Sequence, residues 1–214
     1  MGALIERQLI AGPVGAIETL YNGARLAEGE AQRGVAVIAH PHPLFQGTMD
    51  NKVVHTLARA FVACGWSAVR FNFRGVGATE GVHDEGRGEL DDMLAVIERF
   101  AAKGPLALAG FSFGSFVASH ALERLWQAQR AVERVVLVGT AASRFTVAQV
   151  PALAQLRTLV VHGEADDVVP LASVMDWARP QTLPVTVIPA AGHFFHGQLP
   201  LLKDLVERHV RSVT

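Results

Sequence analysis

The chain has 214 residues, of which 50% are hydrophobic and 18% charged, and its 19 basic and 20 acidic side chains give a formal net charge of -1. These values predict one globular domain over residues 1–214 and exclude collagen-like, coiled-coil and disordered chains. The near-neutral charge argues against nucleic acid or anionic lipid as a partner. The lone Cys64 excludes a disulfide framework and a multi-thiolate metal site.

No stretch of the chain has the pattern of an export signal or of a membrane span. Glu6 and Arg7 stand where a signal peptide carries its apolar run. Every apolar run is far shorter than the roughly 20 residues needed to cross a bilayer. We therefore expect a cytoplasmic protein with no membrane partner, and the sequence specifies no oligomeric state.

Extended and helical patterns alternate along the chain. Residues 5–22 predict two strands joined by a turn at Gly12-Pro13, and short apolar runs predict strands over 35–39, 68–71, 106–109, 135–138, 159–161 and 185–189. Apolar residues at helical spacing predict helices after Asp50 or Asn51, after Gly88, over 116–125 and over 199–210. This alternation predicts an α/β fold, with a mostly parallel, doubly wound sheet flanked by helices.

The strongest chemical signal is the pentapeptide Gly110-Phe111-Ser112-Phe113-Gly114, which matches G-x-S-x-G between a predicted strand and a predicted helix. Such a turn holds a serine nucleophile with its Oγ projecting, and the flanking glycines let strand and helix cross closely. The backbone N–H of Phe113, at the start of the helix, is the natural donor to a developing oxyanion. In the alternative interpretation Ser112 only caps the helix. The strand-turn-helix setting favours catalysis.

A serine nucleophile needs a base that is oriented by a carboxylate, and on such a sheet the chain order is Ser, acid, His. Asp166 follows the predicted strand at 159–161 and is the candidate acid. Asp167 and Glu164 are its rivals, with the alternative that they are solvated loop charges.

The candidate base is His193. It follows Gly192 directly after the predicted strand at 185–189, where the third member of a triad is needed. His196 is its rival, three residues further on, and we expect it to have a supporting or structural role.

The segment His40-Pro41-His42-Pro43 follows the predicted strand at 35–39, where this kind of fold supplies its second oxyanion donor. Proline has no N–H, so the donor is the backbone of His42 or, as the weaker alternative, of Leu44. His-x-His is also a metal-binding spacing. A metal site needs further ligands at matching spacing, and because the sequence offers none we predict no metal.

The other polar residues that stand out receive structural interpretations. We expect His120 on a helix face, His162 at a strand end, Cys64 as a buried thiol and Arg74 as a brace beside the site. The remaining histidines are expected to be exposed: His55, His83 and His209.

With these motifs in hand, the chain resembles a family of small, lidless bacterial α/β-hydrolases, mostly described as predicted hydrolases or carboxylesterases and related to dienelactone hydrolase. The blocks that carry the resemblance cover nearly the whole chain: HPHPLFQGTMDNKVV from His40, RFNFRGVGATEG from Arg70, GFSFGS from Gly110, GEADDVVP from Gly163 and GHFFHG from Gly192. The resemblance implies Ser112 as nucleophile, Asp166 as acid, His193 as base, His42 and Phe113 as oxyanion donors, and no metal or organic cofactor. Two positions depart from the family pattern, Gln46 in place of Gly and Thr79 in place of Ser.

The sequence therefore predicts a serine hydrolase that cleaves small-molecule esters through an acyl-enzyme. Thioesters are the next substrate class. Amide cleavage by a peptidase with the same triad is less suited, because the triad must then protonate a poorer leaving group and the sequence has no recognisable peptide-binding domain. A different class, a noncatalytic binding module on the same fold, is disfavoured because all three triad residue types are present.

Only residues 139–157 lie between the strand after the nucleophile helix and the strand that carries the acid. This length suits a loop and one short helix, but not a cap domain of several helices. We therefore expect an open, shallow cleft without a lid, with walls from the loops near Leu44, Phe45, Phe145, Phe194 and Phe195.

Overall fold

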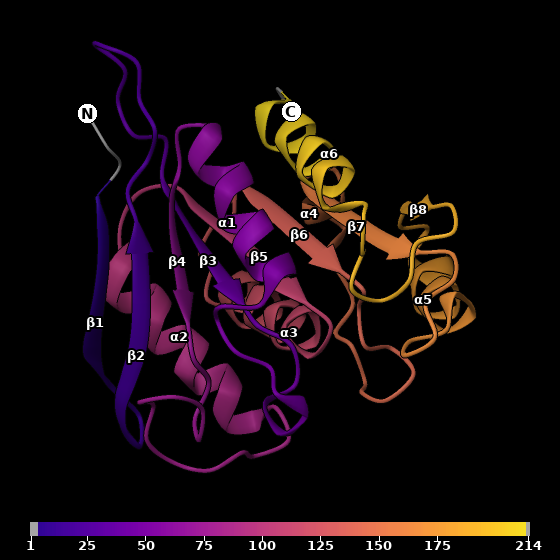
Figure 1. Ribbon diagram of the computed structural model, residues 1–214, viewed down its shortest axis with the longest axis horizontal. Helices are drawn as coiled ribbons and strands as arrows, with labels where there is room; N and C mark the ends of the chain where they lie inside the picture. The colour runs from indigo at the N-terminus through magenta and orange to yellow at the C-terminus, as the bar shows by residue number, and fades with distance from the viewer. Residues whose placement is uncertain (1–3, 213–214) are drawn as a thin grey trace.

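The structure is a computed structural model that describes residues 4–212. Within this range eight strands form one sheet in the order β1-β2-β4-β3-β5-β6-β7-β8 (Figure 1). The strands are β1 (Ile5–Gly12), β2 (Gly15–Asn22), β3 (Val35–Ala39), β4 (Ser67–Phe71), β5 (Leu106–Phe111), β6 (Arg134–Val138), β7 (Thr158–Gly163) and β8 (Val185–Ile188). The two antiparallel pairs both involve β2, and the block from β4 to β8 is parallel.

Helices cover both faces of the sheet, as expected for a doubly wound fold (Figure 1). One face packs against α1 (Lys52–Ala63) and α6 (Leu199–Arg211). The other packs against α2 (Arg87–Ala101), α3 (Phe113–Gln127), α4 (Ala152–Gln155) and α5 (Leu171–Ala178). Two short 3-10 turns complete the described elements, η1 (Pro43–Phe45) and η2 (Arg179–Gln181).

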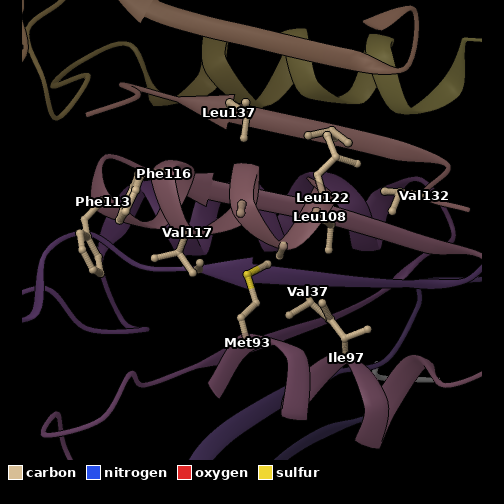
Figure 2. Packing of buried hydrophobic residues seen from close by; sticks show 14 of the residues in the cluster. Val37, Met93, Ile97, Leu108, Phe113, Phe116, Val117, Leu122, Val132 and Leu137 are labelled. Carbon is tan, nitrogen blue, oxygen red and sulfur yellow. The ribbon is translucent and has the colours of Figure 1, made fainter. Parts of the chain in front are cut away.

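The central strands are buried on both faces, which explains their continuous apolar runs. Successive residues of a strand point to opposite faces, so Val37 of β3 and Leu108 of β5 belong to one core cluster while Ile38 belongs to the other. Figure 2 shows the first cluster, where Met93 and Ile97 of α2 face these strands. The alternation holds two separate helical layers on one sheet.

The strand order indicates which end of the sheet binds ligands. The chain runs from β3 out to β4 and returns to β5 on the other side of β3. At such a switch point the loops beyond the carboxyl ends of the two central strands diverge and leave a crevice. The segment after β3 carries His42, and the segment after β5 carries Ser112.

The predicted strands and helices are all present, with boundaries that differ by a few residues. Asn51, not Asp50, caps α1, because its side chain accepts a hydrogen bond from Val53 N at 2.8 Å. Between β6 and β7 the only helix within the described residues is α4. The expectation of a lidless α/β-hydrolase fold is confirmed. The helix α5 was not predicted.

Candidate active site

Ser112 lies on a strained turn between β5 and α3. Its backbone has φ 57° and ψ -117°, a conformation that costs a non-glycine residue on the order of 1–3 kcal/mol. Hydrogen bonds on both sides hold it there: Ser112 N donates to Val138 O of β6 at 2.8 Å, and Ser115 N donates to Ser112 O at 3.0 Å. The turn points the side chain away from the sheet and into the crevice.

The glycines two positions before and after Ser112 are required by close approaches. A Cβ on Gly110 would overlap the carbonyl group of Gly114, and a Cβ on Gly114 would overlap the carbonyl group of Ala39 at the end of β3. The G-x-S-x-G spacing therefore has the packing role that the sequence predicts.

Ser112, His193 and Asp166 form a continuous chain of contacts although they are far apart in sequence. Ser112 Oγ lies 3.0 Å from His193 Nε2, and His193 Nδ1 lies 2.7 Å from Asp166 Oδ2. All three residues are buried. Each follows the end of a parallel strand, β5, β7 or β8, so the fold brings the three predicted residues together at one edge of the sheet.

The rival residues lie outside this chain of contacts. Asp167 and His196 are exposed, and the ring of His196 lies 6.0 Å from that of Phe194. Glu164 Oε2 accepts a hydrogen bond from Ala190 N at 3.0 Å, which ties two loops together. The geometry therefore favours Asp166 and His193 over all three.

Asp166 is held as a charged carboxylate. Burial raises its pKa, but hydrogen bonds from His193 and from Val169 N, together with the neighbouring imidazoles, outweigh burial and leave the pKa below its ordinary value. Its second oxygen, Oδ1, accepts from Val169 N at 2.7 Å and from Val168 N at 3.0 Å. Both oxygens are thus engaged, which fixes the carboxylate plane against the imidazole.

Two residues that support His193 were missed by sequence reasoning. The ring of Phe111 lies 4.9 Å from the imidazole, centroid to centroid. Gly139, directly after β6, has φ 55°, and a Cβ there would lie 3.3 Å from His193 Cε1. The signal for Gly139 was present, since it follows a predicted strand at the same edge of the sheet as the other site residues.

The two expected oxyanion donors have backbone N–H groups without acceptors among residues 4–212. Phe113 is the first residue of α3, and His42 directly precedes η1. The alternative donor, Leu44 N, is engaged because it donates to His42 Nδ1 at 3.2 Å. Both free N–H groups belong to residues that line the same cavity as Ser112.

The cavity beside Ser112 has a volume of about 440 Å³. Its walls are mostly apolar, and its lining residues are Pro41, His42, Phe45, Gln46, Gly47, Asn51, Ser112, Phe113, Ala141, Arg144, Phe145, Val168, Val169, His193 and Phe194. Phe45, Phe145 and Phe194 are walls, as predicted. Leu44 and Phe195 do not line it. Leu44 is exposed, and Phe195 is buried in the core beneath α1 and α6.

The expectation that His83 and His209 are exposed is wrong. The side chain of His83 is 12% exposed, and its Nδ1 lies 2.7 Å from Glu89, a fully buried carboxylate that also accepts from Asp84 N and Gly86 N. His209 is half-buried, and its Nε2 lies 3.1 Å from the carbonyl oxygen of Arg157. His55 is exposed, as predicted.

The His-x-His segment does not assemble a metal centre. His40 Nε2 accepts a hydrogen bond from Phe73 N at 3.0 Å, and its Nδ1 lies 2.5 Å from the carbonyl oxygen of Pro41. Both ring nitrogens are therefore engaged by the backbone. Among residues 4–212 no group of three or more His, Cys, Asp or Glu side chains has the geometry to hold a metal ion.

The departures from the family pattern have visible structural effects. Gln46 has φ 61° and ψ 21°, the left-handed conformation that favours glycine. Thr79 keeps the hydroxyl function of Ser, since its Oγ1 donates to Asn72 O at 2.8 Å and accepts from Glu18 N at 3.0 Å.

Arg74 is buried and braces the loop through two hydrogen bonds from its side chain to Asp92.

No helix within residues 4–212 has the length and apolar character needed to cross a membrane.

Comparison with known proteins identifies the family. A family model described as the thioesterase domain matches residues 82–203. An α/β serine hydrolase without a lid from Xanthomonas campestris is 33% identical, with 97% of this chain and 94% of that chain covered and a TM-score of 0.84. An α/β serine hydrolase homologue from Coxiella burnetii is 37% identical, with 95% and 96% covered and a TM-score of 0.78. The chain belongs to the α/β serine hydrolases of the thioesterase-domain family, as a member without a lid.

A further relative is an uncharacterised protein of Rickettsia prowazekii, which is 38% identical over 117 residues. The match covers 53% of this chain and 48% of that protein, so it spans about half the length of this curated relative.

Proposed function

We propose that the protein hydrolyses small esters by acyl transfer, as a carboxylesterase does. In this proposal Ser112 is the nucleophile, His193 the general base and Asp166 the carboxylate that orients the base. The observation that carries the proposal is the chain of contacts from Ser112 Oγ to His193 Nε2 at 3.0 Å and from His193 Nδ1 to Asp166 Oδ2 at 2.7 Å. This chain starts at a strained turn that opens into a cavity.

In the first step His193 Nε2 removes the proton from Ser112 Oγ as the oxygen attacks the carbonyl carbon of the ester. The imidazolium that forms is stabilised by Asp166, which remains charged because its pKa lies below the ordinary value. The negative charge that develops on the carbonyl oxygen faces the N–H groups of Phe113 and His42. Two such fixed donors stabilise the tetrahedral intermediate more than the planar substrate.

In the second step the intermediate collapses. The bond to the leaving alkoxide breaks, His193 gives it the proton, and the acyl group stays on Ser112. A water molecule then loses a proton to His193, attacks the acyl carbon, and releases the carboxylic acid with the Ser112 hydroxyl restored. Because no lid covers the cavity within residues 4–212, water reaches the acyl-enzyme from the open side.

A thioester is the second candidate substrate, favoured by the match of the thioesterase-domain model over residues 82–203. The same residues can carry both reactions. A thiolate leaves more readily than an alkoxide, so a thioester requires no further catalytic group. Comparing kcat/KM for an oxygen ester and a thioester of the same acyl group distinguishes the two specificities.

Covalent labelling tests the proposal directly. We expect a fluorophosphonate probe to label the wild-type protein at Ser112 and to leave Ser112→Ala unlabelled, with kcat of this variant reduced on the order of 10⁶. Ser143→Ala is a suitable control because Ser143 is exposed on a nearby loop. A label mapped to Ser115 or Ser143 contradicts the assignment of the nucleophile. A wild-type protein that is neither labelled nor active supports a noncatalytic binding module instead.

A further inference from the structure

The cavity beside Ser112 has an unbalanced charge. Among the residues that line it, within the described part of the chain, none is Asp or Glu. Arg144 is the one Lys or Arg among them. A cation at the mouth of an apolar cavity, with no carboxylate in the same wall, attracts ligands of the opposite charge.

The guanidinium of Arg144 has no hydrogen-bond or ion-pair partner among residues 4–212. No carboxylate, carbonyl or hydroxyl group there accepts a hydrogen bond from it. Its contact is with an aromatic ring, because Arg144 Cζ lies 5.9 Å from the centroid of Phe45, another wall of the cavity. By contrast, the guanidinium of Arg74 is paired with Asp92. The donors of Arg144 are therefore available to a ligand.

The backbone that carries Arg144 is fixed although the side chain is exposed. Arg144 N donates to Ala141 O at 3.2 Å, and Phe145 N donates to the same oxygen at 3.1 Å. The ring of Phe145 stacks on Phe116 of α3 at 4.8 Å. This turn holds the base of the side chain beside the cavity.

The charge of Arg144 also contributes to the pKa of His42, another residue that lines the cavity. Burial lowers the pKa of His42 most, the charge of His83 lowers it further, Glu89 raises it, and Arg144 lowers it by the smallest of these contributions. Arg144 and His42 line the same cavity, so the guanidinium lies on the same side of the molecule as the expected oxyanion donor.

We propose that Arg144 selects esters or thioesters whose acyl chain is short and ends in a carboxylate. A guanidinium binds a carboxylate through two parallel hydrogen bonds, a geometry that lysine or a histidine does not reproduce. The walls formed by Phe45, Phe145 and Val168 suit the methylene groups between the carboxylate and the reacting carbonyl. This inference rests on the proposed hydrolase function and adds the substrate class.

The test compares 4-nitrophenyl hydrogen glutarate with its neutral analogue, in which a primary amide replaces the carboxylate. The measured quantity is the ratio of the two kcat/KM values, each corrected for hydrolysis in buffer. In the wild type we expect the acidic ester to be preferred about tenfold, a modest value because the side chain is exposed to water. The preference should fall towards one in Arg144→Gln, and in 1 M salt, where charges are screened beyond about 3 Å.

Arg124→Gln is the matched control. Arg124 is exposed on α3 and does not line the cavity, so this variant makes the same change in charge and should keep the wild-type ratio. An equal preference in the wild type and in Arg144→Gln overturns the inference.

Binding of glutarate, measured by calorimetry, separates this inference from the proposed reaction. A Kd that rises about tenfold in Arg144→Gln, with no such change in Arg124→Gln, supports a carboxylate site even if neither ester is hydrolysed. The same Kd in all three proteins, or no binding to any of them, overturns it. Absence of hydrolysis of both esters contradicts only the proposed function.

Discussion

His162 and Asp166 both bind the backbone of Val169. Asp166 Oδ1 accepts from Val169 N at 2.7 Å, and His162 Nε2 lies 2.8 Å from the Val169 carbonyl oxygen. A carbonyl oxygen only accepts, so His162 Nε2 carries the hydrogen. The same nitrogen lies 3.4 Å from Asp166 Oδ2. The imidazole thus holds the loop that positions the proposed acid, a role beyond the strand end that the sequence predicted.

Replacing His162 should weaken this loop. In His162→Leu the buried carbonyl group of Val169 loses its donor, and we expect the free energy of unfolding to fall by about 1–3 kcal/mol. His162→Gln, whose amide N–H₂ can take the place of Nε2, should recover part of the loss. Urea unfolding of the three proteins provides the measurement. A leucine variant as stable as the wild type would show that this contact contributes nothing.

Two adjacent aspartates should differ sharply in their effect on catalysis. Asp166→Asn should reduce kcat by on the order of 10⁴, because an amide favours the wrong tautomer of His193. Asp167→Asn should cost little, since Asp167 is exposed and outside the chain of contacts. Steady-state kinetics on one ester compares the pair, and the reverse order would move the acid by one residue.

The side chain of His42 should be dispensable if only its backbone N–H faces the oxyanion. We expect His42→Ala to keep most of the activity, apart from the effect of losing the hydrogen bond from Leu44 N and the contact with the ring of Phe113 at 4.9 Å. Activity should also resist a metal chelator. A loss of several orders of magnitude in a folded variant, measured as kcat/KM, would assign a catalytic or metal-binding role to the imidazole.

Stability should decrease in mild acid because of His40. Burial lowers the pKa of His40 to about 4, from an ordinary value of 6.5 in the unfolded chain. Between these values the unfolded state binds more protons than the folded state, so the free energy of unfolding falls as the pH drops from about 6.5 to about 4. The loss from this residue is about 3 kcal/mol.

His40→Gln isolates that contribution. The amide oxygen of Gln can accept the hydrogen bond from Phe73 N, but the side chain does not titrate. The difference in unfolding free energy between pH 7 and pH 5 should therefore be smaller in the variant than in the wild type. If the free energy of unfolding depends on pH in the same way in both proteins, His40 is not responsible for the loss of stability in acid.

Short esters should be preferred to long-chain lipids. The cavity of about 440 Å³ accommodates a short acyl chain, and Phe45 at its mouth is 70% exposed. Each CH₂ that stays in water forgoes roughly 0.8 kcal/mol of burial, so kcat/KM should level off after the first few carbons of a 4-nitrophenyl ester series. A steady rise beyond about ten carbons, or a jump when micelles form, would contradict the absence of a lid.

The sequence predicted the sheet well because its central strands are buried on both faces and leave continuous runs of Val, Leu, Ile and Ala. It did not predict α5, which has only eight residues, Leu171–Ala178. Two turns give a weak helical period, although Leu171, Val174 and Ala178 have the required spacing. The loop residues that line the cavity beside Ser112 were harder still to predict. Phe195 has φ 52°, a local reversal that buries its ring while its neighbour Phe194 stays exposed.

The candidate triad was predictable because its members follow strands in a fixed order. The environment of His83 was not, since nothing in the charged stretch around it shows that Glu89 turns inward. That carboxylate is buried because it accepts three hydrogen bonds at once, from His83 and from the backbone ahead of α2. Such a cluster depends on the path of the loop, which a single sequence does not encode as a pattern.

The strand that leads to His193 is an edge strand. Within the described residues β8 is four residues long and pairs with β7 alone, whereas Ser112 follows the central strand β5. Short edge strands open locally at a lower free energy than the core of a sheet. Separating His193 from Ser112 therefore requires only that β8 fray, while the central strands remain paired. On heating, activity should disappear before the secondary structure melts, so the thermal limit of the proposed hydrolase is set by its outermost strand.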